Sequence, residues 1–263
     1  MSVRHPAVAG MFYPADPDEL RRAVSEAFAH AVRPPDDAAV PKALIVPHAG
    51  YPYSGAVAAS AYLRLVPAHD TIDRVVLLGP SHRVHLRGLA APVDNLFATP
   101  LGMVLIDSDL RAAVRELPGV TLDDLPHFHE HSLEVQLPFL QTVLDDFTLL
   151  PLSVGDTTAE QVATVLDAVW GGPETVVVIS TDLSHYHPYR QAQHLDARTA
   201  AAIVAGDADA VGDLDACGSR PLRGTMQVAG ERGLSIENID LRNSGDTAGD
   251  RDRVVGYGAF VVG

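Results

Sequence analysis

The chain has 263 residues and a formal net charge of −15, with 47% hydrophobic and 20% charged residues. This length and composition are typical of a globular protein that buries a large core, and we expect a single domain over residues 1–263. The acidic balance argues against nucleic acid or an anionic membrane as the main partner, because both require a basic surface. The one cysteine excludes an internal disulfide framework, and the absence of a secretory signal or long apolar run predicts a cytoplasmic protein.

Short apolar runs bounded by turn residues predict buried strands at intervals along the chain. We expect them at 43–47, 74–79, 102–107, 147–154 and 175–180, with closing strands at 234–241 and 253–262. Helical patterns fall between these runs. We expect helices before Pro41, from Ser54 to about Val66, and over 108–117, 158–170, 194–206 and 221–233.

Polar residues at the helix starts indicate where several helices begin. The expected caps are Asp16 or Asp18, Ser54, and a capping box formed by Thr157 with Glu160. Another apolar pattern covers 132–144, where Pro138 is expected to produce a kink.

Strands and helices alternate through most of the chain, and the middle strands are apolar on both faces. This pattern predicts an α/β fold in which helices cover both sides of a mostly parallel sheet. The closing strands are separated only by the polar segment 243–252, which we interpret as a mobile loop, so this pair is expected to be antiparallel. The central sheet is therefore predicted to be mixed.

Several polar residues follow directly after predicted strands. His48 follows the first strand, His82 the second, and Asp182 with His185 the strand at 175–180. Ligands of open α/β sheets bind outside the carboxyl ends of the strands, so these residues are expected to share one site. Neutral imidazole is the commonest metal ligand, although a pair of loop histidines bonded to backbone would show the same pattern.

Asp182 and His185 lie three residues apart, which places them on the same side if this turn is helical. An aspartate that accepts from one ring nitrogen would fix the tautomer of His185, for a metal ligand or a general acid/base. The alternative is a helix-capping aspartate with an incidental histidine. Cys217 is either a small buried residue or a thiolate ligand for zinc, copper or iron.

Glu130, His131 and Glu134 are further candidates for the lining of this cleft, and so is Tyr51 or Tyr53. A charged helix N-terminus would look the same in sequence. We interpret six other histidines as surface or structural residues: His5, His30, His69, His85, His187 and His194. The chain has no Gly-rich phosphate loop, no HExxH motif and no GxSxG motif.

Taken in order along the chain, the motifs resemble those of the Memo family, which includes protein B of the AmmeMemoRadiSam system. They are AVAGMFYPADP (7–17), PHAGYPYSG (47–55), GPSH (79–82), EHSLEVQLPFL (130–140), STDLSHY (180–186), CGSRP (217–221) and VGYGAFVV (255–262). The resemblance implies a three-layer αβα fold similar to that of class III extradiol ring-cleavage dioxygenases.

The same resemblance implies that His48, His82 and Cys217 hold a metal ion, iron in the first place, with copper or zinc as alternatives. It places Asp182 and His185 in the pocket, where we expect catalytic roles. Non-haem iron oxygenases use two histidines and a carboxylate, so a cysteine as third ligand departs from that pattern.

Three functions follow from these expectations. The first is a dioxygenase-like oxidoreductase in which His185, oriented by Asp182, moves a proton. The second is a zinc-type metallohydrolase. The third is a non-catalytic protein that binds a peptide or a partner; the resemblance implies a radical-SAM protein and a second small protein as partners.

Overall fold

Parallel strands form the centre of the sheet in the computed structural model, which describes residues 2–263. Their order is β6 (Gly102–Ile106), β8 (Thr148–Val154), β3 (Arg74–Pro80), β9 (Thr175–Ser180) and β2 (Ala43–Val46). Each of them contains or overlaps a predicted strand. Because they are parallel, their carboxyl ends lie along one edge of the sheet.

The outer strands make the sheet mixed, as predicted. At one side β12 (Val254–Val262) runs antiparallel to β2, and β11 (Ile236–Asn243) and β10 (His185–His187) are antiparallel to β12. The other side holds short strands that the sequence reading missed: β1 (Val3–Arg4), β4 (Leu89–Ala91), β5 (Leu96–Thr99) and β7 (Val120–Leu122).

Alternate residues of each central strand enter two different cores. In β3, Val75 and Leu77 belong to one core, and Val76 and Leu78 belong to the other. Side chains of successive strand residues point to opposite faces, so a strand that is apolar throughout must be covered on both sides. The predicted three-layer αβα architecture is confirmed.

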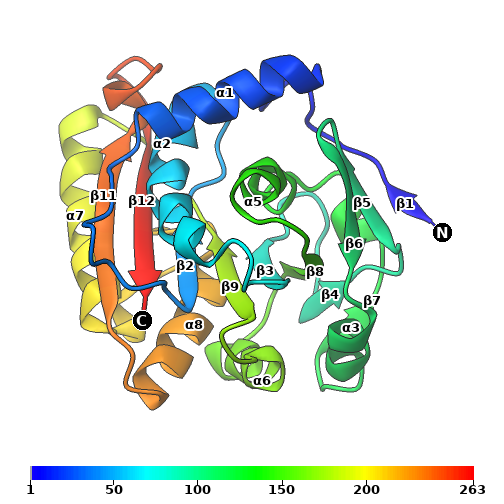
Figure 1. Ribbon diagram of the computed structural model, residues 1–263. Helices are drawn as coiled ribbons and strands as arrows, with labels where there is room; N and C mark the ends of the chain where they lie inside the picture. The colour runs from blue at the N-terminus through cyan, green and yellow to red at the C-terminus, as the bar shows by residue number, and fades with distance from the viewer. Residues whose placement is uncertain (1) are drawn as a thin grey trace.

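Helices cover the two faces in separate groups (Figure 1). The first core is packed by α1 (Pro17–Ala29), α2 (Tyr51–Tyr62) and α5 (Leu137–Val143). The second is packed by α3 (Ser108–Arg115), α6 (Ala159–Val169), α7 (Tyr189–Ala205) and α8 (Ser219–Glu231). Short helical turns complete the connections: η1 (Leu63–Ala68), α4 (Leu125–Phe128), η2 (Glu134–Gln136), η3 (Ala208–Ala210) and η4 (Ser244–Asp246).

Two of the predicted helix caps are wrong. Asp16 caps α1 as expected, but α2 begins at Tyr51, because Gly50 occupies the cap and Pro52 suits the first turn. Ser54 therefore lies inside α2, where its hydroxyl donates to the carbonyl of Ala49. The capping box of α6 pairs Thr158 with Gln161, one residue later than predicted on both sides.

The structure gives the conformation of three further segments. Pro138 lies in the first turn of α5, where no intrahelical N–H bond is lost, so it produces no kink there. The TDLSH segment is not helical: Asp182 lies in a loop and β10 begins at His185. The predicted loop 243–252 contains the turn η4.

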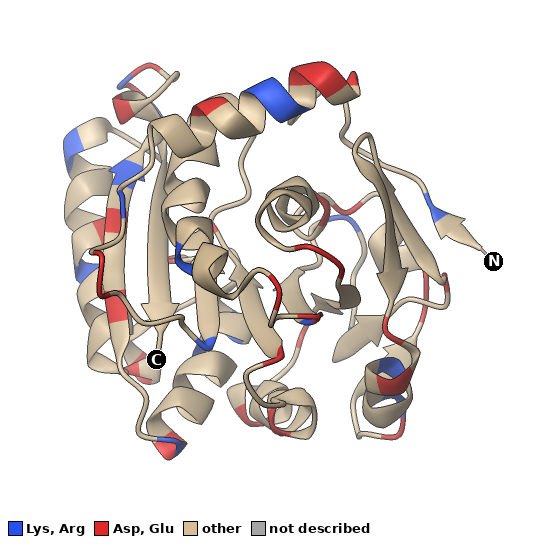
Figure 2. Cartoon of the chain, in the orientation of Figure 1, with Lys and Arg blue, Asp and Glu red and all other residues tan. Residues whose placement is uncertain are grey.

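Charged residues lie mainly on helices and loops, and the central strands carry few (Figure 2). Among residues 2–263, no helix combines the length and the apolar character that a membrane span requires.

Glu134 is buried away from the predicted cleft and binds the N-terminal segment. Its carboxylate accepts from the Arg4 guanidinium, the Tyr13 hydroxyl and the backbone N–H groups of Ala7 (2.7 Å) and Val8 (3.0 Å). Burial, followed by the neighbouring Glu134, raises the pKa of Tyr13 well above its usual range, so the phenol stays protonated and donates. The expectation that Glu134 lines the cleft is wrong.

We predict that Glu134→Ala lowers the free energy of unfolding by about 3–5 kcal/mol, because it leaves the buried Arg4 charge without its partner. Urea denaturation followed by circular dichroism measures this change. Glu237→Ala is the control, since that carboxylate is 65% exposed and lies 3.9 Å from Arg64; its effect should stay within about 0.5 kcal/mol. A loss below about 1 kcal/mol for Glu134→Ala would contradict the buried ion pair.

Candidate metal site

Three histidines from separate segments meet at the carboxyl ends of the central strands. His48 follows β2, His82 follows β3, and His131 precedes η2. One ligand atom from each lies within 4.8 Å of those of the other two. The rings of His82 and His131 are stacked at 4.7 Å between centroids, and His48 meets each of them edge-on. This spacing allows one metal ion to contact all three imidazoles.

Hydrogen bonds leave one ring nitrogen of His48 facing the site. Its Nδ1 lies 2.9 Å from the Ser180 hydroxyl, and that hydroxyl donates its own proton to the carbonyl of Ser132 at 2.6 Å. Ser180 Oγ must therefore accept from His48, which places the ring proton on Nδ1 and a lone pair on Nε2. Burial, followed by His82 and His131, lowers the pKa of His48 well below its usual value, so the ring is neutral.

Glu130 orients His82 in a similar way. Its buried carboxylate accepts from His82 Nδ1 (2.9 Å) and from the backbone N–H groups of His82 (2.6 Å), His131 (2.9 Å) and Ser132 (2.9 Å). Burial acts to raise the pKa of Glu130, but the contacts with His131 and His82 hold it well below its usual range. A carboxylate that holds Nδ1–H leaves Nε2 of His82 free for a metal ion.

The sequence predicted a smaller role for His131 than the structure shows. Its ring lies against those of His48 and His82, and its Nδ1 lies 3.2 Å from Glu130 Oε1 without hydrogen-bond alignment. The ring lines the cleft, as predicted, and it also belongs to the cluster itself. The sequence feature that could have indicated a ligand role is the Glu130–His131 pair in the histidine-rich stretch 126–131.

Cys217 lies beside the histidine cluster, in the segment that precedes α8. Its Sγ is 3.3 Å from His48 Nε2 and accepts the backbone N–H of Asp182 at 3.3 Å. Burial, followed by the nearby Asp182, raises the pKa of the thiol to about 12, so it is protonated without a cation beside it. The structure thus brings Cys217 close to His48 but groups His131 with the other two imidazoles.

Asp182 and His185 both line the cavity that the histidines face, but they do not form the expected pair. Asp182 is buried and accepts the backbone N–H of His48 at 2.7 Å. Burial raises the pKa of its carboxyl group. His185 starts β10, and no hydrogen bond links its ring to Asp182 in the part of the chain that the structure describes. The loop conformation of residues 181–184 explains the difference.

The cavity over the cluster has a volume of about 500 Å³, and we name it the histidine cavity. Tyr53 lines it, whereas Tyr51 is buried and donates to the carbonyl of Val135 at 2.8 Å. The lining is largely aromatic and aliphatic around the imidazoles. It comprises Phe12, His48, Ala49, Gly50, Tyr53, His82, Arg83, His131, Asp182, His185, Tyr186, Ser244, Val255 and Tyr257.

Within the described residues 2–263, the other histidines take no part in the cluster. His30 contacts the carbonyl of Glu26, and His69 pairs with Asp145 at 3.0 Å. His85 lines a separate cavity.

Comparison with known proteins supports the family resemblance that the motifs indicated. The sequence model of the family described as "Memo-like protein" matches residues 4–261. A MEMO1 family protein of Methanopyrus kandleri is 38% identical over 281 residues, with 98% of both chains covered. A MEMO1 family protein of Aeropyrum pernix is 36% identical with both chains fully covered, and one of Methanothermobacter thermautotrophicus is 38% identical with 97% and 98% covered.

Among solved structures, an uncharacterized protein of Escherichia coli K12 has a TM-score of 0.49 and 15% identity, covering 82% of this chain and 98% of its own. The family match over residues 4–261 and the full-length relatives lead to the same conclusion: the chain belongs to the Memo family.

Proposed function

We propose that this Memo-family protein binds one transition-metal ion at the histidine cluster and catalyses a dioxygenase-like oxidation of a small molecule. One observation carries the metal site: three imidazole ligand atoms lie within 4.8 Å of one another. Two of these rings have their second nitrogen engaged by Ser180 and Glu130. Such outer partners are typical of metal-bound histidines.

The donor set fits a first-row transition metal. His48 is neutral and buried, and its Nε2 lone pair faces the site. The third ligand is either His131 or Cys217, and the position of Cys217 Sγ, 3.3 Å from His48 Nε2, suits it as an additional ligand. A thiol loses its proton when it binds a metal, so a bound ion would change the charge of this site.

A bound iron ion would supply redox chemistry toward dioxygen and an organic substrate. The protein would bind that substrate in the histidine cavity, whose lining includes the aromatic rings of Phe12, Tyr53 and Tyr257. We assign His185 the movement of a proton, because its ring lines this cavity without belonging to the cluster. Asp182 positions His48 through the backbone hydrogen bond.

A zinc-type metallohydrolase is the second candidate, and the presence of His131 in the cluster favours it. Three protein ligands with a fourth position for water form a known catalytic zinc pattern. In that case His185 would serve as the base that accepts a proton from water. A non-catalytic role remains the alternative if neither reaction occurs, with a radical-SAM protein and a second small protein as the proposed partners.

We predict near-stoichiometric metal in protein purified without oxygen, and loss of that metal in the double variant His48→Ala, His82→Ala. Plasma mass spectrometry measures the content. Cys217→Ser and His131→Ala, tested in parallel, identify the third ligand by which substitution removes the ion. Stoichiometric metal in the double variant would exclude this cluster as the binding site.

We predict that Glu130→Gln weakens metal binding by about 10–100-fold, because the amide cannot hold His82 as the carboxylate does. Competition titration with a chromophoric chelator gives the dissociation constant. Glu116→Gln removes the same charge from a carboxylate that is 75% exposed, and it should leave the constant unchanged. Equal constants for both variants would show that Glu130 does not tune the site.

We predict that His185→Gln retains the metal but lowers turnover by about 10²–10⁴-fold, the range expected for loss of a positioned acid or base. Oxygen uptake by iron-loaded protein with catechols tests the oxidoreductase. Hydrolysis of nitrophenyl esters by zinc-loaded protein under anaerobic conditions tests the second candidate. Unchanged turnover in the variant would remove His185 from the reaction.

A further inference from the structure

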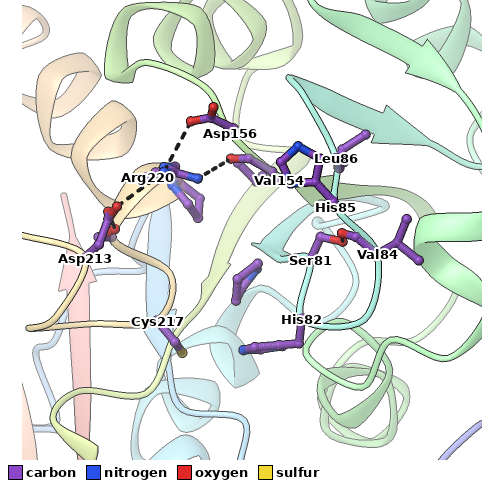
Figure 3. A pocket seen from close by; sticks show the side chains of 14 residues that line it. Ser81, His82, Val84, His85, Leu86, Val154, Asp156, Asp213, Cys217 and Arg220 are labelled. Atoms are coloured by element: carbon purple, nitrogen blue, oxygen red, sulfur yellow. Dashed lines mark hydrogen bonds and ion pairs between the residues drawn. The ribbon is translucent and has the colours of Figure 1, made fainter.

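A second cavity, of about 440 Å³, reaches the same site through different residues, and we name it the Arg220 cavity. It lies between the loop after β3, the end of β8 and the segment that leads into α8. His82 is the residue that its lining shares with the histidine cavity. Figure 3 shows Cys217 and His82 pointing toward one another at one end, with Arg220 at the other.

Apart from the shared His82, each candidate ligand lines only one of the two cavities. His48 and His131 line the histidine cavity, whereas Cys217 lines the Arg220 cavity. The contacts of Cys217 Sγ with His48 Nε2 and with the backbone of Asp182 fix its position between the cluster and this second space. The thiol is therefore reached from the Arg220 cavity.

Arg220 bridges two sides of the cavity through ion pairs. Its Nη2 lies 3.2 Å from carboxylate oxygens of both Asp156, after β8, and Asp213, before α8. Its Nη1 donates to the carbonyl of Gly155 at 3.1 Å. The two carboxylates are 62% and 60% exposed, so they face solvent at the rim. Two carboxylates against one guanidinium leave a negative charge there, which attracts cations.

We propose that the Arg220 cavity is the passage by which the metal ion enters and leaves the site. Cys217 and His82 are the ligands that an ion entering by this cavity meets, and the ion pairs of Arg220 close the passage. As the sulfur–metal bond forms, the thiol proton leaves to water and no group changes its oxidation state. The inference rests on the proposed metal site, but access to Cys217 is measurable without any metal.

Alkylation of metal-free protein by iodoacetamide reports on Cys217 alone, because the chain has one cysteine. His85 and Arg83 form a matched pair: both are exposed on the same loop, but His85 lines the Arg220 cavity and Arg83 lines the histidine cavity. We expect His85→Trp to slow alkylation at least several-fold by filling the passage. Arg83→Trp should leave the rate unchanged.

A second pair of variants tests the closure. Arg220→Met should raise the alkylation rate by about threefold to tenfold, the scale set by loss of two half-exposed ion pairs. Arg223→Met is its control, because Arg223 lies one turn further along α8, is also 35% exposed, pairs with Asp209 at 3.7 Å and does not line the cavity. Circular dichroism verifies that each variant is folded.

Stopped-flow uptake of Co²⁺ and its release to EDTA complete the test. Arg220→Met should raise both rates by a similar factor, so that the dissociation constant stays within about twofold, and His85→Trp should lower both.

Two outcomes would overturn the proposed passage. One is that Arg83→Trp, and not His85→Trp, slows alkylation and metal exchange. The other is that Arg220→Met behaves like Arg223→Met. Wild-type protein that binds no metal would instead overturn the proposed function itself, and the metal route with it.

Discussion

The buried carboxylate of Glu130 is the constraint on which the candidate site depends. A charge taken out of water is tolerated only when other groups satisfy it, and here one ring and three backbone N–H groups do so. These donors belong to the loop after β3 and to the segment before η2. The electrostatic requirement of one side chain therefore brings His82 and His131 together, although they lie far apart in the sequence.

A second buried hydrogen-bond network, centred on Ser180, holds His48 in place. Ser180, at the end of β9, accepts from His48 and Gln136 and donates to Ser132. Every hydrogen-bonding capacity of this hydroxyl is used, so the tautomer of His48 is set by the sheet and not by the ligand. Buried networks that are fully satisfied in this way rigidify their surroundings, which is what a metal site requires of its ligands.

The layered fold and the strand-end location of His48, His82 and Asp182 could be predicted, because they depend on local periodicity and on the common direction of parallel strands. The place of His131 in the cluster could not, since it results from the contacts of the adjacent Glu130 with the distant loop after β3. The same reason applies to Asp182, whose partner is the backbone of His48 and not the nearby His185. The cap predicted at Ser54 was wrong because Gly50 and Pro52 start α2 earlier.

Arg4 links the beginning of the sequence to this site. Besides its ion pair with Glu134, its guanidinium donates to the backbone carbonyls of His127 (3.0 Å) and Glu130 (2.7 Å). Synthesis proceeds from the N-terminus, so Arg4 emerges long before residues 127–134, which supply its ion pair and the two carbonyls. The same guanidinium therefore couples the docking of the N-terminal strand to the position of Glu130. We therefore expect an extension or cleavage near Arg4 to affect the candidate metal site, although Arg4 is more than 120 positions away in the sequence.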